Sequence, residues 1–248
     1  MVTGASAGLG RSFATRLAAT GYDVVVVARD RERLDALAAD LVHRFGCQVE
    51  VLPADLTDRG QLQRVADRLS HAGHPVDLLV NNAGNALRKP FLANDLADEE
   101  SMLDLHVRAT LVLTHAALGP MTARRSGGVI NVASIAGWMP LGTYSAHKAW
   151  VTTFSQAVAR QVAPTGVRVM ALAPGYVRTE FHERAGINAD AFPSAAWLDA
   201  DDVVARTLRA WEKGRVVHVP SARYKAVAGL ARNAPYETIH RIRTRGTR

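Results

Sequence analysis

Short apolar segments alternate with helix-like segments along almost the whole chain, and this alternation is the feature that most constrains the fold. Continuous apolar runs of strand length are typical of strands buried on both faces of a parallel sheet. Repeated strand–helix units with right-handed crossovers predict a doubly wound, mostly parallel sheet of about seven strands, with helices on both faces. No linker or change of composition interrupts the pattern, so we expect one α/β domain over residues 1–248. The predicted strands are Tyr22–Ala28, Gln48–Pro53, Val76–Asn81, Gly128–Ala133, Val167–Ala173 and Val216–Val219, and the two longest predicted helices are Asp98–Ala123 and Thr143–Ala163.

The first strand of such a sheet has little sequence available to it. Only Met1 and Val2 precede Thr3 and Gly4, where the first turn begins. Either this strand is very short, or the start of the chain has been placed several residues too late. A truncated central strand would weaken both stability and the binding of a ligand at its end.

A glycine-rich turn follows this first strand, with glycines at Gly4, Gly8 and Gly10. Glycines there permit a tight turn, a close approach of the backbone to a pyrophosphate, and packing of the next helix against the sheet. The helix that starts near Gly8 directs free N–H groups toward the phosphates. The turn, including Ser6 and Leu9, is therefore predicted to hold a dinucleotide, although its spacing also fits a purely structural turn.

The residues after the second and third predicted strands bear on the choice of cofactor. An acidic residue after the second strand favours NAD, whereas an arginine suits the 2′-phosphate of NADP. Arg29 occupies this place, so NADP(H) is preferred over NAD(H); the alternative is a solvated arginine. Asp30 is expected to cap the helix that begins at Arg31. Asp55, beside Leu56, is a candidate acceptor for the adenine amino group or a simple turn former.

The segment Asn81–Gly84 follows the fourth predicted strand. We expect Asn81 to bridge backbone groups of neighbouring strands, while Asn82, Ala83 and Gly84 border the cofactor. The same residues also fit an ordinary turn.

Three side chains near the fifth strand and the next helix carry the predicted chemistry. Ser134 lies just past the strand, and Tyr144 and Lys148 are four residues apart, hence on one helix face. A phenol with a pKa of about 10 is a poor acid–base catalyst near neutrality. A neighbouring ammonium group favours the phenolate, so we expect Lys148 to lower the pKa of Tyr144.

The combined set of motifs closely resembles the short-chain dehydrogenase/reductase family. The glycine turn, Asn-Asn-Ala-Gly, Ser134, the segment Tyr144–Lys148 and the segment Ala173–Thr179 occur in the right order after the right strands. The resemblance implies a Rossmann-type fold and hydride transfer between nicotinamide and a carbonyl or carbinol carbon. It implies that Tyr144 exchanges the proton, that Ser134 binds the substrate oxygen, and that Lys148 holds the nicotinamide ribose. The residues implied to support the nicotinamide are Pro174, Gly175, Val177 and Thr179.

One position departs from the family pattern. Members usually carry an asparagine that bends the helix and helps hold a water near the lysine, but His106 stands there. An imidazole can donate and accept protons, so His106 is a candidate member of a proton relay. A structural histidine without a proton role is the alternative.

Apolar residues flank the predicted catalytic group. Trp138 and Met139, with Leu141, are predicted either to line the substrate side or to face a partner subunit. Residues 180–200, which include Phe181, resemble a mobile lid over the substrate. Their composition predicts an apolar ketone, aldehyde or matching alcohol as substrate. The alternatives are a catalytically silent NADP-binding regulatory protein and a lipid or steroid reductase at a membrane surface.

Charge and composition exclude several other classes. Four of the seven net positive charges fall between Arg232 and Arg248, and no nucleic-acid-binding motif accompanies them, so no nucleic-acid partner is expected. Residues 221–248 read as a helical and basic tail for which membrane contact is a minor option. One cysteine, Cys47, and no long apolar run fit a cytoplasmic protein. We predict no metal site, and the resemblance implies a homodimer or homotetramer formed through the two long helices.

Overall fold

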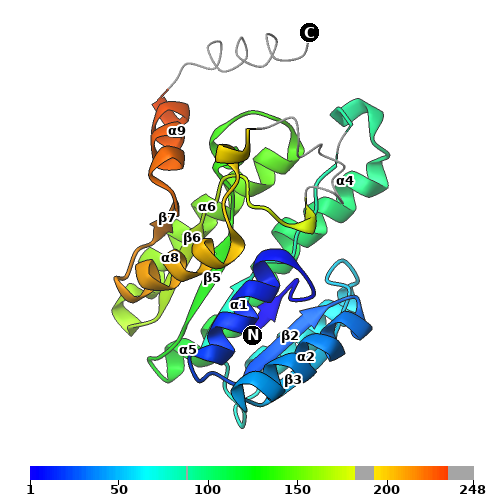
Figure 1. The fold of residues 1–248 in the computed structure, drawn as a ribbon, viewed down its shortest axis with the longest axis vertical. Coiled ribbons are helices and arrows are strands. Elements are labelled where there is room, and N and C mark those ends of the chain that lie inside the picture. The colour runs from blue at the N-terminus through cyan, green and yellow to red at the C-terminus, as the bar shows by residue number, and fades with distance from the viewer. Residues whose placement is uncertain (88, 182–192, 234–248) are drawn as a thin grey trace.

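Seven parallel strands form one sheet in the order β3-β2-β1-β4-β5-β6-β7. The computed structural model describes residues 1–87, 89–181 and 193–233 (Figure 1). The order reverses between β1 and β4, so the loops after these two strands diverge and leave a crevice at their carboxyl ends. The strands are β1 Val2–Thr3, β2 Val24–Ala28, β3 Val49–Pro53, β4 Leu78–Asn81, β5 Gly128–Val132, β6 Arg168–Leu172 and β7 Val217–His218.

Helices cover both faces of this sheet. One face carries α1 (Gly8–Ala19), α2 (Arg31–Phe45) and α8 (Ala200–Glu212). The other carries α3 (Arg59–Ser70), α5 (Ala109–Ala123) and α6 (Thr143–Val162). Two further helices, α4 (Leu96–Leu103) and α9 (Ala222–Asn233), lie at the end of the molecule where the strands finish (Figure 1).

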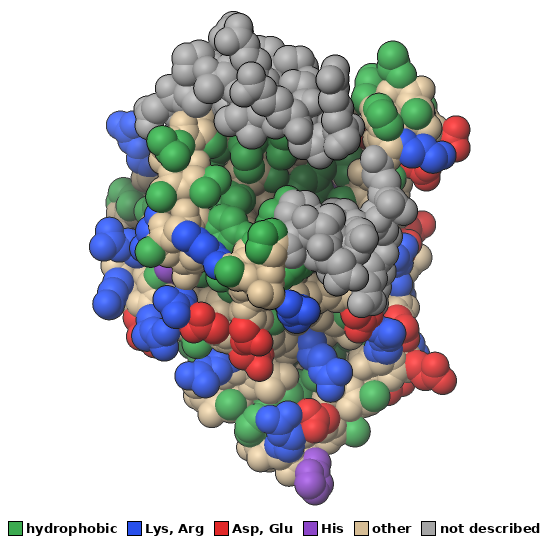
Figure 2. Space-filling model, turned by 45° about the horizontal axis from the view of Figure 1, so that its top comes forward, with side chains coloured by type: hydrophobic (Ala, Val, Ile, Leu, Met, Phe, Trp, Pro, Cys, Tyr) green, Lys and Arg blue, Asp and Glu red, His purple; other side chains and the backbone are tan. Residues whose placement is uncertain are grey.

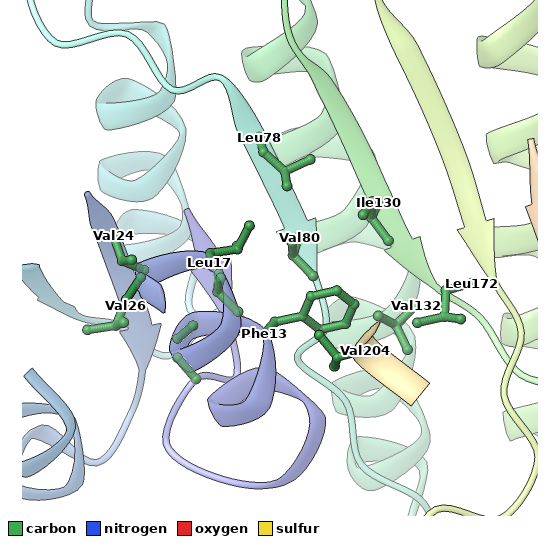
Figure 3. Packing of buried hydrophobic residues seen from close by; sticks show 14 of the residues in the cluster. Phe13, Leu17, Val24, Val26, Leu78, Val80, Ile130, Val132, Leu172 and Val204 are labelled. Carbon is green, nitrogen blue, oxygen red and sulfur yellow. The ribbon is translucent and has the colours of Figure 1, made fainter. Parts of the chain in front are cut away.

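The alternation of side chains along each strand divides the core into two layers. Val24 and Val26 pack on the α1 face, whereas Val25 and Val27 pack on the opposite face. Figure 3 shows the ring of Phe13 from α1 lying close to Val80, Val132 and Val204. Full burial of such side chains stabilises the fold by about 1.5–3 kcal/mol each. Valine-rich strands are therefore apolar on both sides because both sides are covered.

The structure confirms the predicted doubly wound parallel sheet, in which β1 spans Val2–Thr3. It also confirms that Asp30 caps α2, since its side chain accepts a hydrogen bond from the backbone N–H of Arg33 at 3.0 Å. Each observed strand from β2 to β7 lies within its predicted range and begins or ends one or two residues inside it. Residues 221–231 lie in the region of α9, whereas residues 234–248 of the predicted tail lie outside the described residues.

The predicted long helix Asp98–Ala123 is present as α4, a π-helical turn and α5, which follow one another with helical backbone and end at Ala123. The π-helical turn, Asp104–Arg108, lies between α4 and α5. Such turns insert a residue into the helix and are frequent at functional sites. The apolar periodicity does not indicate this turn, in which the His106 side chain accepts a hydrogen bond from the backbone N–H of Asn85.

Within the described ranges, no helix is long and apolar enough to cross a membrane.

Candidate active site

A cavity of about 910 Å³ opens at the carboxyl ends of the strands. Loops after β1 to β6 line it, so it lies where ligands bind in sheets of this kind. Figure 2 shows hydrophobic side chains gathered in a hollow near the top of that view. Residues predicted to bind cofactor or substrate that line the cavity are Gly4, Ser6, Gly8, Leu9, Arg29, Asp55, Leu56, Asn82, Ala83, Gly84, Ser134, Met139, Tyr144, Lys148, Pro174, Gly175, Val177, Thr179 and Phe181.

The glycine turn forms one end of this cavity. Gly4 has a φ of 64°, and a Cβ there would lie 2.8 Å from Asn82 Nδ2. A Cβ on Gly10, which packs behind the turn, would collide with the carbonyl oxygen of Gly4. Helix α1 begins at Gly8 and presents its first N–H groups here. The turn thus has the backbone shape and the donors that fit a pyrophosphate.

Asn82 fastens this turn to the loop after β4. Its Nδ2 donates to the carbonyl oxygens of Thr3 at 2.9 Å and of Gly4 at 3.3 Å. In return, Thr3 Oγ1 accepts hydrogen bonds from the backbone N–H groups of Asn82 and Ala83. These bonds join the turn after β1 to the loop after β4, beside the crevice where the order of the strands reverses.

The bridging role that the sequence analysis gave to Asn81 therefore belongs to Asn82. Asn81 is the last residue of β4 and lies inside the protein, where Nδ2 donates to Thr114 Oγ1 at 3.1 Å and Asn131 Oδ1 at 2.9 Å. Successive residues along a strand point to opposite faces of the sheet, so Asn81 and Asn82 contact different parts of the protein. Sequence alone gave both residues the same turn-like appearance.

Arg29 and Asp55 lie side by side at the far end of the cavity. Arg29 Nη1 is 3.9 Å from Asp55 Oδ2. The Arg29 side chain is largely exposed to solvent, and that of Asp55 is partly exposed. Asp55 Oδ1 accepts from the backbone N–H of Thr57 at 2.9 Å and from Thr57 Oγ1 at 2.7 Å. A free guanidinium edge beside a fixed carboxylate suits the adenosine end of a dinucleotide.

Ser134, Tyr144 and Lys148 meet in the wall of the cavity. Ser134 precedes the short 3₁₀ turn Ile135–Trp138, and its Oγ accepts from the backbone N–H of Ala136 at 3.1 Å. Ser134 faces Tyr144 closely enough to lower the pKa of its hydroxyl. Lys148 Nζ lies 5.7 Å from the centre of the Tyr144 ring and donates to the carbonyl oxygen of Val132 at 2.8 Å. The strand end and the first turn of α6 therefore bring the predicted group together.

Burial governs the ionisation of this group. It raises the pKa of Tyr144 to about 12, against the opposing effect of Ser134. It also lowers the pKa of Lys148 to about 8. The expectation that the pKa of Tyr144 is lowered is therefore wrong for the protein chain alone, because desolvation of the phenol outweighs the favourable contacts. Tyr144 is poised as a proton donor.

His106 lies in the π-helical turn, behind Tyr144. It is not one of the described residues that line the cavity. Its Nε2 accepts a hydrogen bond from the backbone N–H of Asn85 at 3.0 Å. Its ring meets the Tyr144 ring edge-on, with centroids 5.6 Å apart. Burial, with the charge of Lys148 and then His147, lowers the pKa of His106 well below its usual range. The imidazole is therefore neutral at neutral pH.

The substrate side of the cavity differs from expectation in one residue. Met139 and Phe181 line it, together with Leu141, and the Phe181 ring is 6.1 Å from the Tyr144 ring. Trp138 does not line the cavity. Like Met139, Trp138 packs against the apolar cluster near α9, and the Arg232 guanidinium lies 5.7 Å from the centre of its ring.

The structure adds residues that sequence reasoning did not select. Tyr176, Leu87, Ser101 and Leu105 also line the cavity. The last two come from α4 and the π-helical turn, whose packing against the site is a tertiary property. Of the predicted lid, residues 182–192 lie outside the described part, while Val177 forms a bridge with Leu198 beyond them.

In the described part of the chain, no three His, Cys, Asp or Glu side chains gather in a way that could hold a metal ion.

Comparison with known proteins agrees with this geometry. A sulfoacetaldehyde reductase of Chromohalobacter salexigens is 38% identical over 186 residues, which are 73% of this chain and 73% of that protein. A short-chain dehydrogenase of Sphingobium yanoikuyae, solved in complex with NADPH, is 35% identical, with a TM-score of 0.86 over 92% of this chain and 91% of the other. A bulky-bulky ketone specific alcohol dehydrogenase of Comamonas testosteroni is 28% identical, with a TM-score of 0.81 over 94% of this chain and 93% of the other.

A family described as short chain dehydrogenase matches residues 1–189. With the nucleotide cradle, the Ser134–Tyr144–Lys148 group and these relatives together, the chain belongs to the short-chain dehydrogenase/reductase family and is an oxidoreductase of alcohol and carbonyl groups.

Proposed function

We propose that this protein transfers hydride between NADP(H) and an apolar ketone or aldehyde, or the matching alcohol, with Tyr144 as the acid–base group. The observation that carries the proposal is that Ser134, Tyr144 and Lys148 together line the cavity, with the buried Lys148 ammonium 5.7 Å from the centre of the Tyr144 ring. A hydroxyl, a phenol and an ammonium group gathered beside a nucleotide-binding turn are better explained by catalysis than by a structural role.

The protein residues have separate tasks in this reaction. When bound, the nicotinamide supplies or accepts the hydride. Ser134 donates a hydrogen bond to the substrate oxygen, and Tyr144 gives that oxygen its proton in the direction of reduction. The high pKa of Tyr144 keeps the phenol protonated until a substrate is in place. Lys148 holds a positive charge behind it that stabilises the phenolate formed when the proton leaves.

Preference for NADP(H) rests on Arg29. Its guanidinium borders the cavity after β2 and is largely exposed, so it is free to contact a 2′-phosphate. The Sphingobium yanoikuyae relative was solved with NADPH. Both observations favour the phosphorylated cofactor.

An apolar substrate is favoured by the wall opposite the glycine turn. Leu87, Leu105, Met139, Leu141 and Phe181 contribute apolar surface there. The Comamonas testosteroni relative is described as specific for bulky-bulky ketones. A carbonyl with at least one large apolar substituent would bury this surface on binding.

The proposal also includes a homodimer or homotetramer in the cytoplasm. Leu96, Leu103 and Leu111 on α4 and α5 are exposed apolar residues that pairing of these helices would cover. Light scattering after size-exclusion chromatography measures this state directly.

The test of function is a panel of aryl, alkyl and hydrophilic ketones and aldehydes, followed by loss of NADPH absorbance, with NADH in parallel. We expect turnover of bulky apolar carbonyls with a preference for NADPH. Binding of NADPH without turnover of any carbonyl or alcohol would contradict the catalytic part. Turnover limited to small hydrophilic aldehydes would contradict the substrate class alone.

A further inference from the structure

Three buried polar side chains lie behind Tyr144, and the mechanism above uses none of them. Glu99 on α4 is 7% exposed, His147 on α6 is 9% exposed, and His106 in the π-helical turn is 1% exposed. They come from three elements that contact one another, since α6 packs against both α4 and the π-helical turn. In Figure 1, α4 lies at the upper right of the view.

The rings and charges place these side chains in one cluster. The rings of His106 and His147 meet edge-on, with centroids 5.7 Å apart, and His106 meets Tyr144 in the same manner. Glu99 acts electrostatically on His147, and His147 acts on His106. The cluster therefore extends from Glu99 through the two histidines to the ring of the acid–base residue.

Each side chain of the cluster has one buried nitrogen or oxygen atom without a hydrogen-bond partner among the described residues. Glu99 Oε1 accepts from Asn94 Nδ2 at 2.8 Å, and His106 Nε2 accepts from the Asn85 N–H at 3.0 Å. The buried atoms Glu99 Oε2, His147 Nδ1 and His106 Nδ1 make no hydrogen bond with another described residue. Since Nε2 of neutral His106 is an acceptor, its proton is on Nδ1, which must donate.

Isolated buried polar atoms are costly, at about 1–3 kcal/mol each. Three of them within one small cluster are consistent with donors and acceptors that are joined through bridging waters. A metal ion does not explain the cluster, because no such group among the described residues could hold one. A simple packing role does not explain it either, since apolar residues would fill the same space without the cost of desolvation.

We propose that Glu99, His147 and His106 form one buried hydrogen-bond chain that positions the Tyr144 ring, with His147 as its central link. The chain joins α4 and α6 to the π-helical turn and, through the Asn85 N–H, to the loop that borders the cofactor side of the cavity. His147 and Glu99 are positioning residues: they act on the reaction through His106 and the Tyr144 ring. This inference rests on the proposed role of Tyr144.

The surrounding charges support a chain of neutral imidazoles. The ionisable groups that act on the two histidines are Glu99 from α4 and Lys148 from α6, besides the histidines themselves. Burial is the largest effect at both rings and lowers both pKa values, while Glu99 raises that of His147. Lys148 lies next to His147 in sequence and disfavours a second positive charge. Neutral rings each retain one donor and one acceptor, as a chain requires.

The test separates the hydrogen bond from the volume of the side chain. His147→Asn keeps a polar group close to the Nδ1 position, whereas His147→Leu removes it. We expect His147→Leu to lower kcat about tenfold, the size typical of losing a positioning partner. The KM for the carbonyl and the Kd for NADPH stay within about twofold, and His147→Asn restores most of kcat. Glu99→Gln gives a smaller loss, and the double variant with His147→Leu is no worse than His147→Leu alone. The matched control is His115→Leu, a histidine exposed on α5, which leaves kcat unchanged.

A spectroscopic measurement does not depend on turnover. Imidazole ¹⁵N spectra of the folded protein show His106 neutral with its proton on Nδ1, and His147→Leu shifts that Nδ1 resonance. An unmoved His106 resonance with kcat within twofold of the parent would overturn the chain. Equal loss of kcat in His147→Asn and His147→Leu, with additive effects of Glu99→Gln, would show a packing role only. Failure of the proposed function would appear differently, as absent turnover in the parent protein while the resonance still shifts.

Discussion

The charged side chains at the two ends of the cavity differ in their exposure to solvent. At the adenosine end, the Arg29 side chain is 78% exposed and its neighbour Asp55 is 34% exposed. At the catalytic end, Lys148 is 5% exposed and its ammonium rests against a single backbone carbonyl. Burial shifts the pKa of Lys148 to about 8 and that of Tyr144 to about 12.

This difference separates recognition from chemistry. Charges in water are screened and can be exchanged with small effects on the rest of the protein. Charges held out of water are expensive, but they act strongly on the protonation of their neighbours. Variants at the catalytic end are therefore expected to change rates and stability, and variants at the adenosine end to change mainly the choice of ligand.

The largest effect is expected for Tyr144→Phe. The phenylalanine keeps the ring contacts with His106 and Phe181 but removes the hydroxyl that we propose exchanges the proton. We expect kcat to fall about 10³-fold, as for loss of a general acid. NADPH affinity, measured by protein fluorescence, stays within about twofold because the ring stays in place. A variant that retains a tenth of the parent rate would remove Tyr144 from the acid–base role.

Lys148→Met is expected to lower turnover about 100-fold and yet to stabilise the fold. Keeping the ammonium buried costs about 3 kcal/mol, given the shift of its pKa from 10.5 to about 8. Loss of the hydrogen bond to the Val132 carbonyl offsets about half of that gain, leaving about 1–2 kcal/mol. Denaturant unfolding at pH 7 measures the difference. A less stable variant would show that Lys148 is a structural residue.

The same pKa shift sets a pH dependence with a definite sign. Below about pH 8, Lys148 is protonated in both the folded and the unfolded chain, so the full cost of burial applies. Between about pH 8 and 10.5 only the unfolded chain keeps the proton, so this group adds stability as the pH rises. Turnover that needs the ammonium falls over the same range. These opposite trends are absent in Lys148→Met.

Asn82→Ala tests the link between the two ends. Its amide holds the glycine turn to the loop after β4 through the carbonyls of Thr3 and Gly4. We expect a loss of about 2 kcal/mol in unfolding free energy and an NADPH Kd about tenfold higher, since two partly buried bonds disappear. The control is Gln63→Ala, an amide exposed on α3. Unchanged NADPH affinity would show that the turn keeps its shape without this residue.

The smallest effect is expected for Arg29→Asp. The change should move the ratio of NADPH to NADH efficiency about tenfold toward NADH, with stability unchanged, because the site is exposed and screened. Raising the salt concentration should weaken the NADPH preference of the parent protein. Arg31→Asp, an exposed change two residues away on α2, serves as control. Equal ratios in the parent and Arg29→Asp would leave Arg29 as a solvated residue.

Much of the fold follows from patterns that are local in sequence. The valine-rich segment Val24–Ala28 and the capping Asp30 occupy the positions that their composition predicts. The π-helical turn does not follow from local pattern, because His106 is held there by the N–H of Asn85, which lies 21 residues away. Trp138 and Met139 likewise look alike in sequence and both pack against the apolar cluster near α9, but only Met139 also lines the cavity.

The sequence by itself determined the layered α/β fold, the glycine turn and the proposed catalytic group Ser134, Tyr144 and Lys148. These features depend on residue type, spacing and position after a strand, all of which are written along the chain. Only the tertiary structure decided which asparagine fastens the turn, how burial sets the pKa values of Tyr144 and Lys148, and that Glu99 and His147 lie behind the active site. Desolvation and hydrogen bonding depend on what surrounds a group in space, and those neighbours come from strands and helices far apart in sequence.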